Sequence, residues 1–261
     1  MNGDQLKYQC NETIKYNDLY TVMKTDRCVL ITGTIAPNVP DILRSDVQRR
    51  RVEYLDALRF YRAELDLPIF FLENSSFDVE GDEDFRQLFE QDIELVKFEP
   101  SEHPEKGKGY QEFEVLDHAI DQLSAQFTSI IKVTGRYKVE NIKQLARHMI
   151  NGIMADLHRK KEVAITGCFI ADRKFYAEYI AGLYRKCNDE NGDWIERVLY
   201  RTIKKQDLWE HVDLFPENPI YTGVPGSHSG TLERHPLKMK LRNAERKVLK
   251  ALNMHEFPYE Y

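Results

Sequence analysis

Three apolar runs in the first half of the chain each end in small polar residues, and this pattern restricts the fold more than any other. The runs are "CVLITGTIAP" from Cys28, "LPIFFLENSS" from Leu67 and "SIIKVTGRYK" from Ser129. Apolar runs of this kind are typical of strands buried on both faces, as in parallel sheets. Because helical patterns alternate with them, we predict an α/β fold with a mainly parallel central sheet flanked by helices.

Hydrophobic spacing and capping signals predict the remaining elements. Ser45 to Gln48 has the pattern of a capping box, which predicts a helix that runs to about Leu65. The other expected helices are residues 82–92, 111–123, 141–151, 173–186, a helix after Trp194 and a basic helix at 237–252, and the further expected strands are 94–100 and 163–171. No linker separates independent domains, so we expect residues 1–261 to form one domain with a C-terminal helical elaboration.

The composition is that of an ordinary globular protein. Hydrophobic residues make up 42% of the chain, and its net charge is −6. A chain of this charge is not expected to bind nucleic acid in general. The first residues show no secretory signal pattern, and the four cysteines show no CxxC spacing. We therefore expect a cytoplasmic protein with buried reduced thiols.

The polar ends of the three apolar strands are expected to form one ligand site. In open α/β sheets, ligands bind outside the carboxyl ends of the strands. Those ends carry Gly33-Thr34, Glu73-Asn74-Ser75 and Thr134-Gly135-Arg136. The sequence therefore predicts that these groups converge on one crevice.

Six segments in a fixed order resemble nucleotide-sugar glycosyltransferases of the GT-A fold. They are "LITGTIAPN", "RRVEYLDALRFY", "IFFLENSSFD", "KGKGYQEFEVLDHAI", "IIKVTGRYKVEN" and "GDWIERVLYR", and they lie within residues 27–205. More narrowly, they resemble bacterial-type enzymes of polysaccharide and lipopolysaccharide synthesis. The resemblance implies a nucleotide-sugar-binding half at 27–141, an acceptor-side half at 142–236, and a basic helix and tail at 237–261.

The resemblance also implies roles for two strand ends. In GT-A enzymes the second strand ends in an acidic residue that holds the nucleoside, and Glu73 has that position, with Asn74 beside it. Thr34, after the first strand, is a further candidate for contact with the base or ribose. A later strand of these enzymes ends in a metal-binding DXD motif, where this chain has Thr134-Gly135-Arg136. A requirement for Mn²⁺ or Mg²⁺ is therefore left open.

Glycosyl transfer from such a donor leaves negative charge on a diphosphate, which a cation must stabilise. A guanidinium suits two phosphate oxygens at once, so we expect Arg136 to contribute this charge. Lys106 or Lys108, in a glycine-flanked loop before a helix, is expected to assist it. Alternatively, Arg136 pairs with a carboxylate such as Glu112 or Glu140 and shapes a turn.

An inverting transferase needs a carboxylate that takes the proton of the acceptor hydroxyl. Four carboxylates crowd the loop and helix start around Trp194, namely Asp189, Glu190, Asp193 and Glu196. Glu196 is the preferred candidate and Asp193 the second, because Glu196 begins a helix beside an aromatic ring suited to stacking on a sugar. In a retaining enzyme this assignment fails.

The C-terminal region adds two ambiguous features. The loop "GVPGSHSGT" carries Ser227 and His228, and it is either a mobile loop over the donor or a plain surface loop. The helix at 237–252 has six basic residues and an apolar stripe of Leu237, Leu241, Ala244, Val248 and Leu252. Packing of that stripe onto the domain is the preferred interpretation, and peripheral contact with an anionic membrane is compatible with it.

The sequence thus favours a hexosyl- or pentosyltransferase that moves a sugar from a nucleotide donor to a glycan or lipid-linked acceptor. A sugar-phosphate nucleotidyltransferase is the first alternative, although "GTIAPN" lacks the basic residues that such a loop usually has. A catalytically inactive nucleotide-sugar-binding module is the second.

Overall fold

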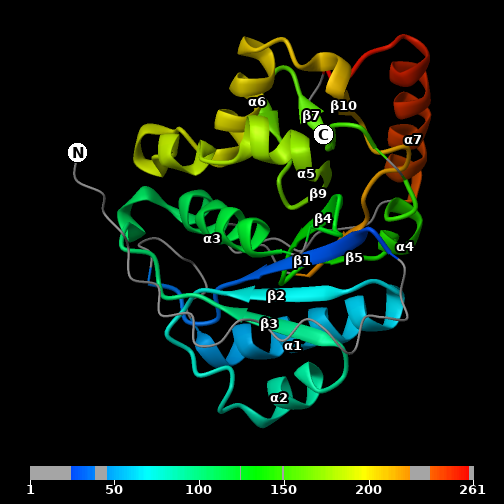
Figure 1. The fold of residues 1–261 in the computed structure, drawn as a ribbon. Coiled ribbons are helices and arrows are strands. Elements are labelled where there is room, and N and C mark those ends of the chain that lie inside the picture. The colour runs from blue at the N-terminus through cyan, green and yellow to red at the C-terminus, as the bar shows by residue number, and fades with distance from the viewer. Residues whose placement is uncertain (1–24, 39–45, 124, 149, 224–235, 259–261) are drawn as a thin grey trace.

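The computed structural model of the chain describes residues 25–38, 46–123, 125–148, 150–223 and 236–258. Within these ranges one seven-stranded sheet runs through the molecule, and helices lie on both of its faces (Figure 1). In chain order the strands and helices are β1 (Arg27–Gly33), α1 (Val47–Glu64), β2 (Ile69–Glu73), α2 (Glu83–Phe89), β3 (Ile93–Lys97), α3 (Lys108–Gln122), β4 (Ser129–Thr134), β5 (Lys138–Val139), α4 (Ile142–Leu145), β6 (Ile153–Met154), β7 (Leu157–His158), β8 (Val163–Ala164), β9 (Cys168–Asp172), α5 (Arg173–Phe175), α6 (Ile195–Lys205), β10 (Val212–Asp213), β11 (Tyr221–Thr222) and α7 (Pro236–Ala251).

The strand order of the central sheet is β10-β6-β9-β4-β1-β2-β3. β1 pairs in parallel with β2 and β4, and β2 pairs in parallel with β3. β9 is antiparallel to both of its neighbours, β4 and β6. The expected α/β class, with a mainly parallel sheet flanked by helices, is confirmed.

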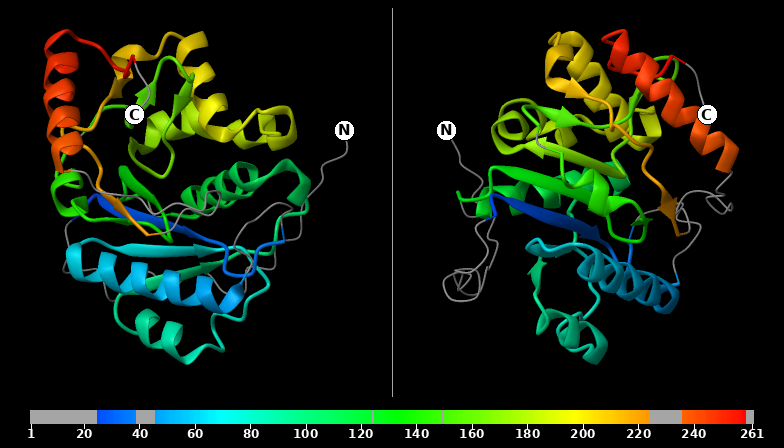
Figure 2. Two further views of the ribbon diagram at one scale, coloured as in Figure 1. Left: turned by 180° about the vertical axis from the view of Figure 1, so that it is seen from behind. Right: turned by 90° about the vertical axis from the view of Figure 1, so that its right-hand side faces the viewer.

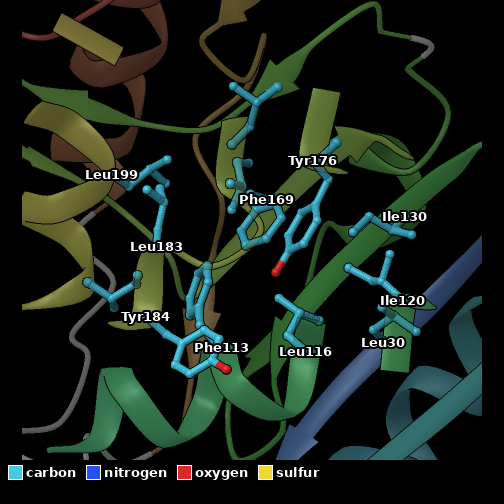
Figure 3. Packing of buried hydrophobic residues seen from close by; sticks show 14 of the residues in the cluster. Leu30, Phe113, Leu116, Ile120, Ile130, Phe169, Tyr176, Leu183, Tyr184 and Leu199 are labelled. Atoms are coloured by element: carbon cyan, nitrogen blue, oxygen red, sulfur yellow. The ribbon is translucent and has the colours of Figure 1, made fainter. Parts of the chain in front are cut away.

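The apolar strands are buried on both faces because each face is covered by helices. Along β1, Cys28 and Leu30 belong to one hydrophobic cluster, and Val29 and Ile31 belong to the other. Helices α1 and α2 cover the second face, and α3 and the C-terminal helices cover the first (Figure 2). Figure 3 shows side chains of α3, such as Leu116, packed between the sheet and the C-terminal half of the chain.

Helices α1 and α3 differ in how they begin. The cap of α1 is Asp46, whose carboxylate accepts a hydrogen bond from Arg49 N. It lies one residue after the expected cap Ser45, which is outside the described residues, and the helix starts at Val47. α3 starts at Lys108, earlier than expected, directly after Gly107 at φ 99°. A side chain at Gly107 would collide with Asp189, so glycine is required there both by its backbone conformation and by the close approach.

The C-terminal half departs from the expected elements because short apolar runs do not reveal where the chain turns. The expected strand 163–171 is divided into β8, which pairs with β7 outside the central sheet, and β9, which belongs to the central sheet. The expected helix 141–151 is only α4, four residues long. The expected helix 173–186 begins as α5, continues as a π-helical turn at Tyr176–Ile180, and resumes as a 3-10 turn at Leu183–Lys186 after an interruption at Gly182 with φ 79°. The carboxylate of Asp117 holds this interruption by accepting hydrogen bonds from Tyr176 Oη and Gly182 N, both at 2.6 Å.

The thiols of Cys28, Cys168 and Cys187 are free and buried, as expected, while Cys10 lies outside the described residues. Burial raises the pKa of the Cys187 thiol to about 12, so this thiol stays protonated at neutral pH. Within the described part of the chain, no helix is long and apolar enough to cross a bilayer.

Helix α7 is attached to the domain through a polar face, contrary to the expected packing of its apolar stripe. Arg246 is 3% exposed and forms a bidentate ion pair with Asp156, at 2.6 and 2.5 Å. Its guanidinium also donates to Phe215 O and Asn218 Oδ1 and lies over the ring of Phe257. The stripe faces solvent instead, because the side of the helix opposite to it carries this buried ion pair.

We predict that Arg246→Met destabilises the fold by about 3 kcal/mol, because it leaves the carboxylate of Asp156 without its main partner. Urea unfolding followed by circular dichroism measures the loss. Lys247→Met, at the adjacent exposed position, is the control and should change the free energy of unfolding by less than about 0.5 kcal/mol. Equal effects of the two variants would contradict this role of Arg246.

Candidate active site

A pocket of about 740 Å³ lies at the carboxyl ends of β1, β2 and β4, bordered by α1, α3 and α6. The described residues that line it are Thr32, Gly33, Thr34, Pro37, Arg50, Tyr54, Leu72, Asn74, Lys108, Gly109, Gln111, Glu112, Val115, Thr134, Arg136, Tyr137, Val163, Ile165, Thr166, Gly167, Asp189, Trp194, Ile195 and Glu196. Its volume is in the range of small-molecule sites. Residues of all three strand ends line the pocket, as expected, but Glu73, Ser75 and Gly135 are not among them.

Strand register brings these ends together. Gly33 of β1 is the register partner of Glu73 in β2, and Thr32 is that of Thr134 in β4. The hydroxyl of Thr34 donates to Asn74 Oδ1 at 2.6 Å, which ties the loops after β1 and β2 to each other. Thr34 and Asn74 thus form one polar wall of the pocket.

The expected nucleoside contact through Glu73 does not fit its position. Its side chain is fully buried and accepts hydrogen bonds from Ile35 N, Ser75 N and Ser75 Oγ. It also forms an ion pair with Lys97. The carboxylate is thus used to hold the loops after β1 and β2, and Asn74 is the group of this strand end that lines the pocket.

Arg136 lines the pocket and is 9% exposed. Its guanidinium donates to Glu53 Oε2 of α1 at 3.1 Å, so its carboxylate partner is neither Glu112 nor Glu140 as considered from the sequence. Gly135 does not line the pocket, but its N donates to Thr32 O at 2.9 Å. A Cβ at that position would lie 2.6 Å from Thr32 O, so glycine lets the turn that carries Arg136 approach β1 closely.

Arg50 is a second cation in this wall that the sequence reasoning missed. It is 5% exposed, lines the pocket and donates to the carbonyl oxygens of Thr34 and Ile35. Arg50 and Arg136 line the same pocket, and burial, with a contribution from the like charge of Arg136, lowers the pKa of Arg50. In the sequence, Arg50 could have been found from its helical spacing to Tyr54 and Ala57, which are buried on the same side of α1.

The opposite wall is formed by the first turns of α3 and α6. Lys108 lines the pocket at the start of α3, whereas Lys106, in the preceding turn Pro104–Lys106, does not. Gln111 is 3% exposed, and its Nε2 has no hydrogen-bond partner among the described residues. An amide donor is therefore left for a ligand, beside the amino terminus of a helix.

Glu196, in the first turn of α6, lines the pocket and accepts a hydrogen bond from Thr166 Oγ1 at 3.2 Å. Burial, followed by the negative charge of Glu112, raises the pKa of the Glu196 carboxyl. Asp193 is directed elsewhere, since its Oδ1 pairs with Arg201 Nη1 at 2.6 Å and it does not line the pocket.

Asp189 and Trp194 also border the pocket near Glu196. Asp189 Oδ2 accepts from Lys108 N at 3.2 Å, and burial raises the pKa of this carboxyl. Its Oδ1 has no hydrogen-bond partner among the described residues. The ring of Trp194 stacks with the guanidinium of Arg197, 4.4 Å from the ring centroid.

An ion pair between a fully buried lysine and a partly exposed carboxylate lies beside the pocket. Lys132 of β4 is fully buried, and its Nζ lies 2.7 Å from Glu112 Oε1. It also donates to Thr134 Oγ1 and to Thr166 O. Burial would raise the pKa of Glu112, but the positive charge of Lys132 and hydrogen bonds from Lys132, Thr32 and Thr134 outweigh it and lower the pKa. Sequence analysis did not anticipate this pair, because Lys132 interrupts an apolar strand with no partner nearby in sequence.

The described residues do not fit a carboxylate-bound divalent metal. They contain no group of three or more His, Cys, Asp or Glu side chains placed to hold one. The carboxylate nearest to Thr134, that of Glu112, already accepts from an ammonium and two hydroxyls. Ser227 and His228, the other expected donor contacts, lie outside the described residues.

No protein-family model and no curated protein sequence matches the chain. Among solved structures, it is similar to a protein described as a nucleotide-diphospho-sugar transferase from Desulfovibrio desulfuricans G20, with 9% identity, a TM-score of 0.42 and coverage of 70% of this chain and 77% of that one. It is also similar to the glycosyltransferase GlyE of Streptococcus pneumoniae TIGR4, with 13% identity and a TM-score of 0.46 over 69% of this chain and 44% of that one.

A third similar structure is 4-diphosphocytidyl-2C-methyl-D-erythritol synthase from Anaerococcus prevotii DSM 20548, with 12% identity and a TM-score of 0.42 over 86% of this chain and all of that one. The chain spans less than half the length of GlyE. All three likenesses have TM-scores below 0.5 and identities of 9–13%.

We predict that Lys132→Met lowers the free energy of unfolding by about 3 kcal/mol, because it removes the charge that pairs with Glu112. The double variant Lys132→Met/Glu112→Gln should recover part of this loss, which urea unfolding measures. Lys204→Met removes one partner of the exposed Lys204–Glu162 pair, and it should leave the free energy of unfolding nearly unchanged. A double variant no more stable than Lys132→Met alone would contradict the pairing.

Proposed function

We propose that the chain is a glycosyltransferase that moves a sugar from a nucleoside-diphosphate sugar to a glycan or lipid-linked acceptor. The observation that carries the proposal is the division of one pocket into two chemical halves. Arg50 and Arg136 provide positive charge beside the polar wall of Thr34 and Asn74, and Glu196 stands among acidic and aromatic groups at the start of α6.

The cationic half suits the diphosphate of the donor. A preorganised guanidinium in a partly buried site stabilises the charge that develops on the leaving group, typically by about 3 kcal/mol per donor. Arg136 and Arg50 are held in place by Glu53 and by backbone carbonyls before any ligand binds. Lys108 and the amide of Gln111, on the opposite wall at the start of α3, are further donors. Thr34 and Asn74 offer hydrogen bonds to the base or ribose.

The acidic half suits the acceptor. In an inverting reaction, the acceptor oxygen attacks the sugar C1, the bond from C1 to the diphosphate breaks, and a base takes the hydroxyl proton. Glu196 is the proposed base, because its raised pKa makes it a stronger proton acceptor than an exposed carboxylate. Thr166 orients it by a hydrogen bond. Asp189 is the second carboxylate of this wall, and Trp194 offers a ring face near it.

Several finer points belong to the same proposal. The donor sugar is a hexose or pentose, the acceptor belongs to polysaccharide or lipopolysaccharide synthesis, and the enzyme acts in the cytoplasm. Arginine and lysine, rather than Mn²⁺ or Mg²⁺, provide most of the positive charge under the diphosphate.

A sugar-phosphate nucleotidyltransferase remains the alternative function. Transfer assays with a nucleoside triphosphate and a sugar phosphate distinguish it from a glycosyltransferase.

The first experiment is a thermal-shift screen with UDP-, GDP-, CMP- and TDP-sugars, each with Mn²⁺ and with EDTA. A ligand that binds only the native state raises the melting temperature. We expect one nucleotide family to stabilise the protein equally in EDTA. No shift with any nucleotide would contradict the proposal, and a shift only with Mn²⁺ would contradict its metal-independent form.

Arg136→Lys keeps the charge of the site but loses the planar fork that binds two phosphate oxygens. We predict a fall in turnover of about 100-fold, with an unchanged melting temperature in the absence of ligand. Arg59→Lys is the control, because Arg59 is exposed on α1 and lies near Asp84 outside the pocket. Turnover of Arg136→Lys close to that of the control would exclude Arg136 from the leaving-group site.

The raised pKa of Glu196 predicts a pH dependence. Because the base must be deprotonated, kcat/KM should fall as the pH drops through the pKa of Glu196, which lies above the ordinary value of about 4.3. Glu196→Gln should abolish transfer while donor binding persists, as thermal shift measures. Transfer retained in Glu196→Gln would move the base to Asp189, which Asp189→Asn then tests.

A further inference from the structure

Helix α7 and the residue that follows it carry a concentration of exposed apolar side chains. Among the described residues, six large hydrophobic side chains are exposed, and four of them are Leu237, Leu241, Val248 and Leu252, at 57–64%. Ala244, between them in sequence, is exposed as well. Successive members of this set are separated by four, three, four and four residues, so they lie along one side of the helix. We call these five residues the α7 stripe.

The α7 stripe is not needed to attach the helix. The opposite side is fixed by Arg246 on Asp156, by Leu249, which is 4% exposed, and by Asn243, whose Oδ1 accepts from Asn218 N at 2.9 Å. Figure 2 shows α7 on the outside of the molecule in both views. A helix that is held by one side and apolar on the other offers a surface to a partner outside the described fold.

The charges beside the stripe indicate the chemistry of that partner. Lys240 and Lys247 are exposed and flank the stripe on one side, seven residues apart. Glu245, which is half-buried, is the single acidic residue in the sequence of α7. A second copy that docked antiparallel through the same stripe would bring these lysines near their own equivalents, which is unfavourable. An anionic surface, by contrast, complements both the apolar stripe and its basic flank.

We propose that α7 docks in the plane of an anionic lipid bilayer. Its 16 residues extend about 24 Å, and an amphipathic helix of this kind buries its apolar side at the boundary of headgroups and acyl chains. The leucines and Val248 enter that boundary, and Lys240 and Lys247 contact anionic headgroups. The contact is peripheral, and the polar side of α7 keeps its attachment to the domain.

The test is flotation of the full chain with vesicles of phosphatidylcholine alone or with one third phosphatidylglycerol. We expect binding to the anionic vesicles and at least tenfold weaker binding to the neutral ones. Val248→Glu should reduce binding to anionic vesicles at least tenfold. The matched control is Val52→Glu, because Val52 is exposed to a similar extent on α1, outside the stripe and the pocket. Melting temperatures verify that both variants are folded.

A second pair of variants tests the charge component. Lys240→Gln and Lys247→Gln should each weaken binding to anionic vesicles about fivefold, and raising the salt concentration should weaken binding of the native protein. The proposal is overturned if the protein does not bind anionic vesicles, or if Val248→Glu binds as well as Val52→Glu. It is also overturned if light scattering shows a dimer that Val248→Glu dissociates, because the stripe would then be an interface between copies.

Discussion

The register between β1 and its two parallel neighbours, β2 and β4, determines where the polar strand ends lie. Gly33, Glu73 and Thr134 end their strands at one edge of the sheet because the pairs Gly33–Glu73 and Thr32–Thr134 are aligned. A shift of one residue would also exchange the side chains that face the two hydrophobic clusters. The apolar alternation along these strands thus holds the pocket wall in place as well as the core.

Three carboxylates in the described part of the chain are each paired with a cation, and these pairs have a structural role. Glu73 with Lys97, Glu112 with Lys132, and Asp156 with Arg246 each satisfy a carboxylate inside the domain. Glu196, in contrast, has a hydroxyl rather than a cation as its hydrogen-bond donor, and burial raises its pKa. A carboxylate whose pKa is raised is suited to accept a proton, whereas the carboxylates paired with cations are suited to hold loops and strands in place.

The two proposals use different parts of the molecule. The transferase proposal depends on groups collected from α1, α3, α6 and the strand ends. The membrane proposal depends on α7, which is attached through Asp156 and Asn218 and does not line the pocket. Either proposal can therefore fail in its own experiment without affecting the other.

The sequence by itself determined the class of the fold and the position of the pocket, because buried strands and strand-end residues are local patterns with known consequences. It also indicated Thr34, Asn74, Lys108, Arg136 and Glu196 as pocket residues. Only the tertiary structure decided that Glu73 is used internally, that Arg50 and Lys132 belong to the site, and that the α7 stripe faces outward. Each of these depends on which distant partner a charge meets, such as Lys97, Glu112 or Asp156, and pairings across the chain leave no periodic signal in the sequence.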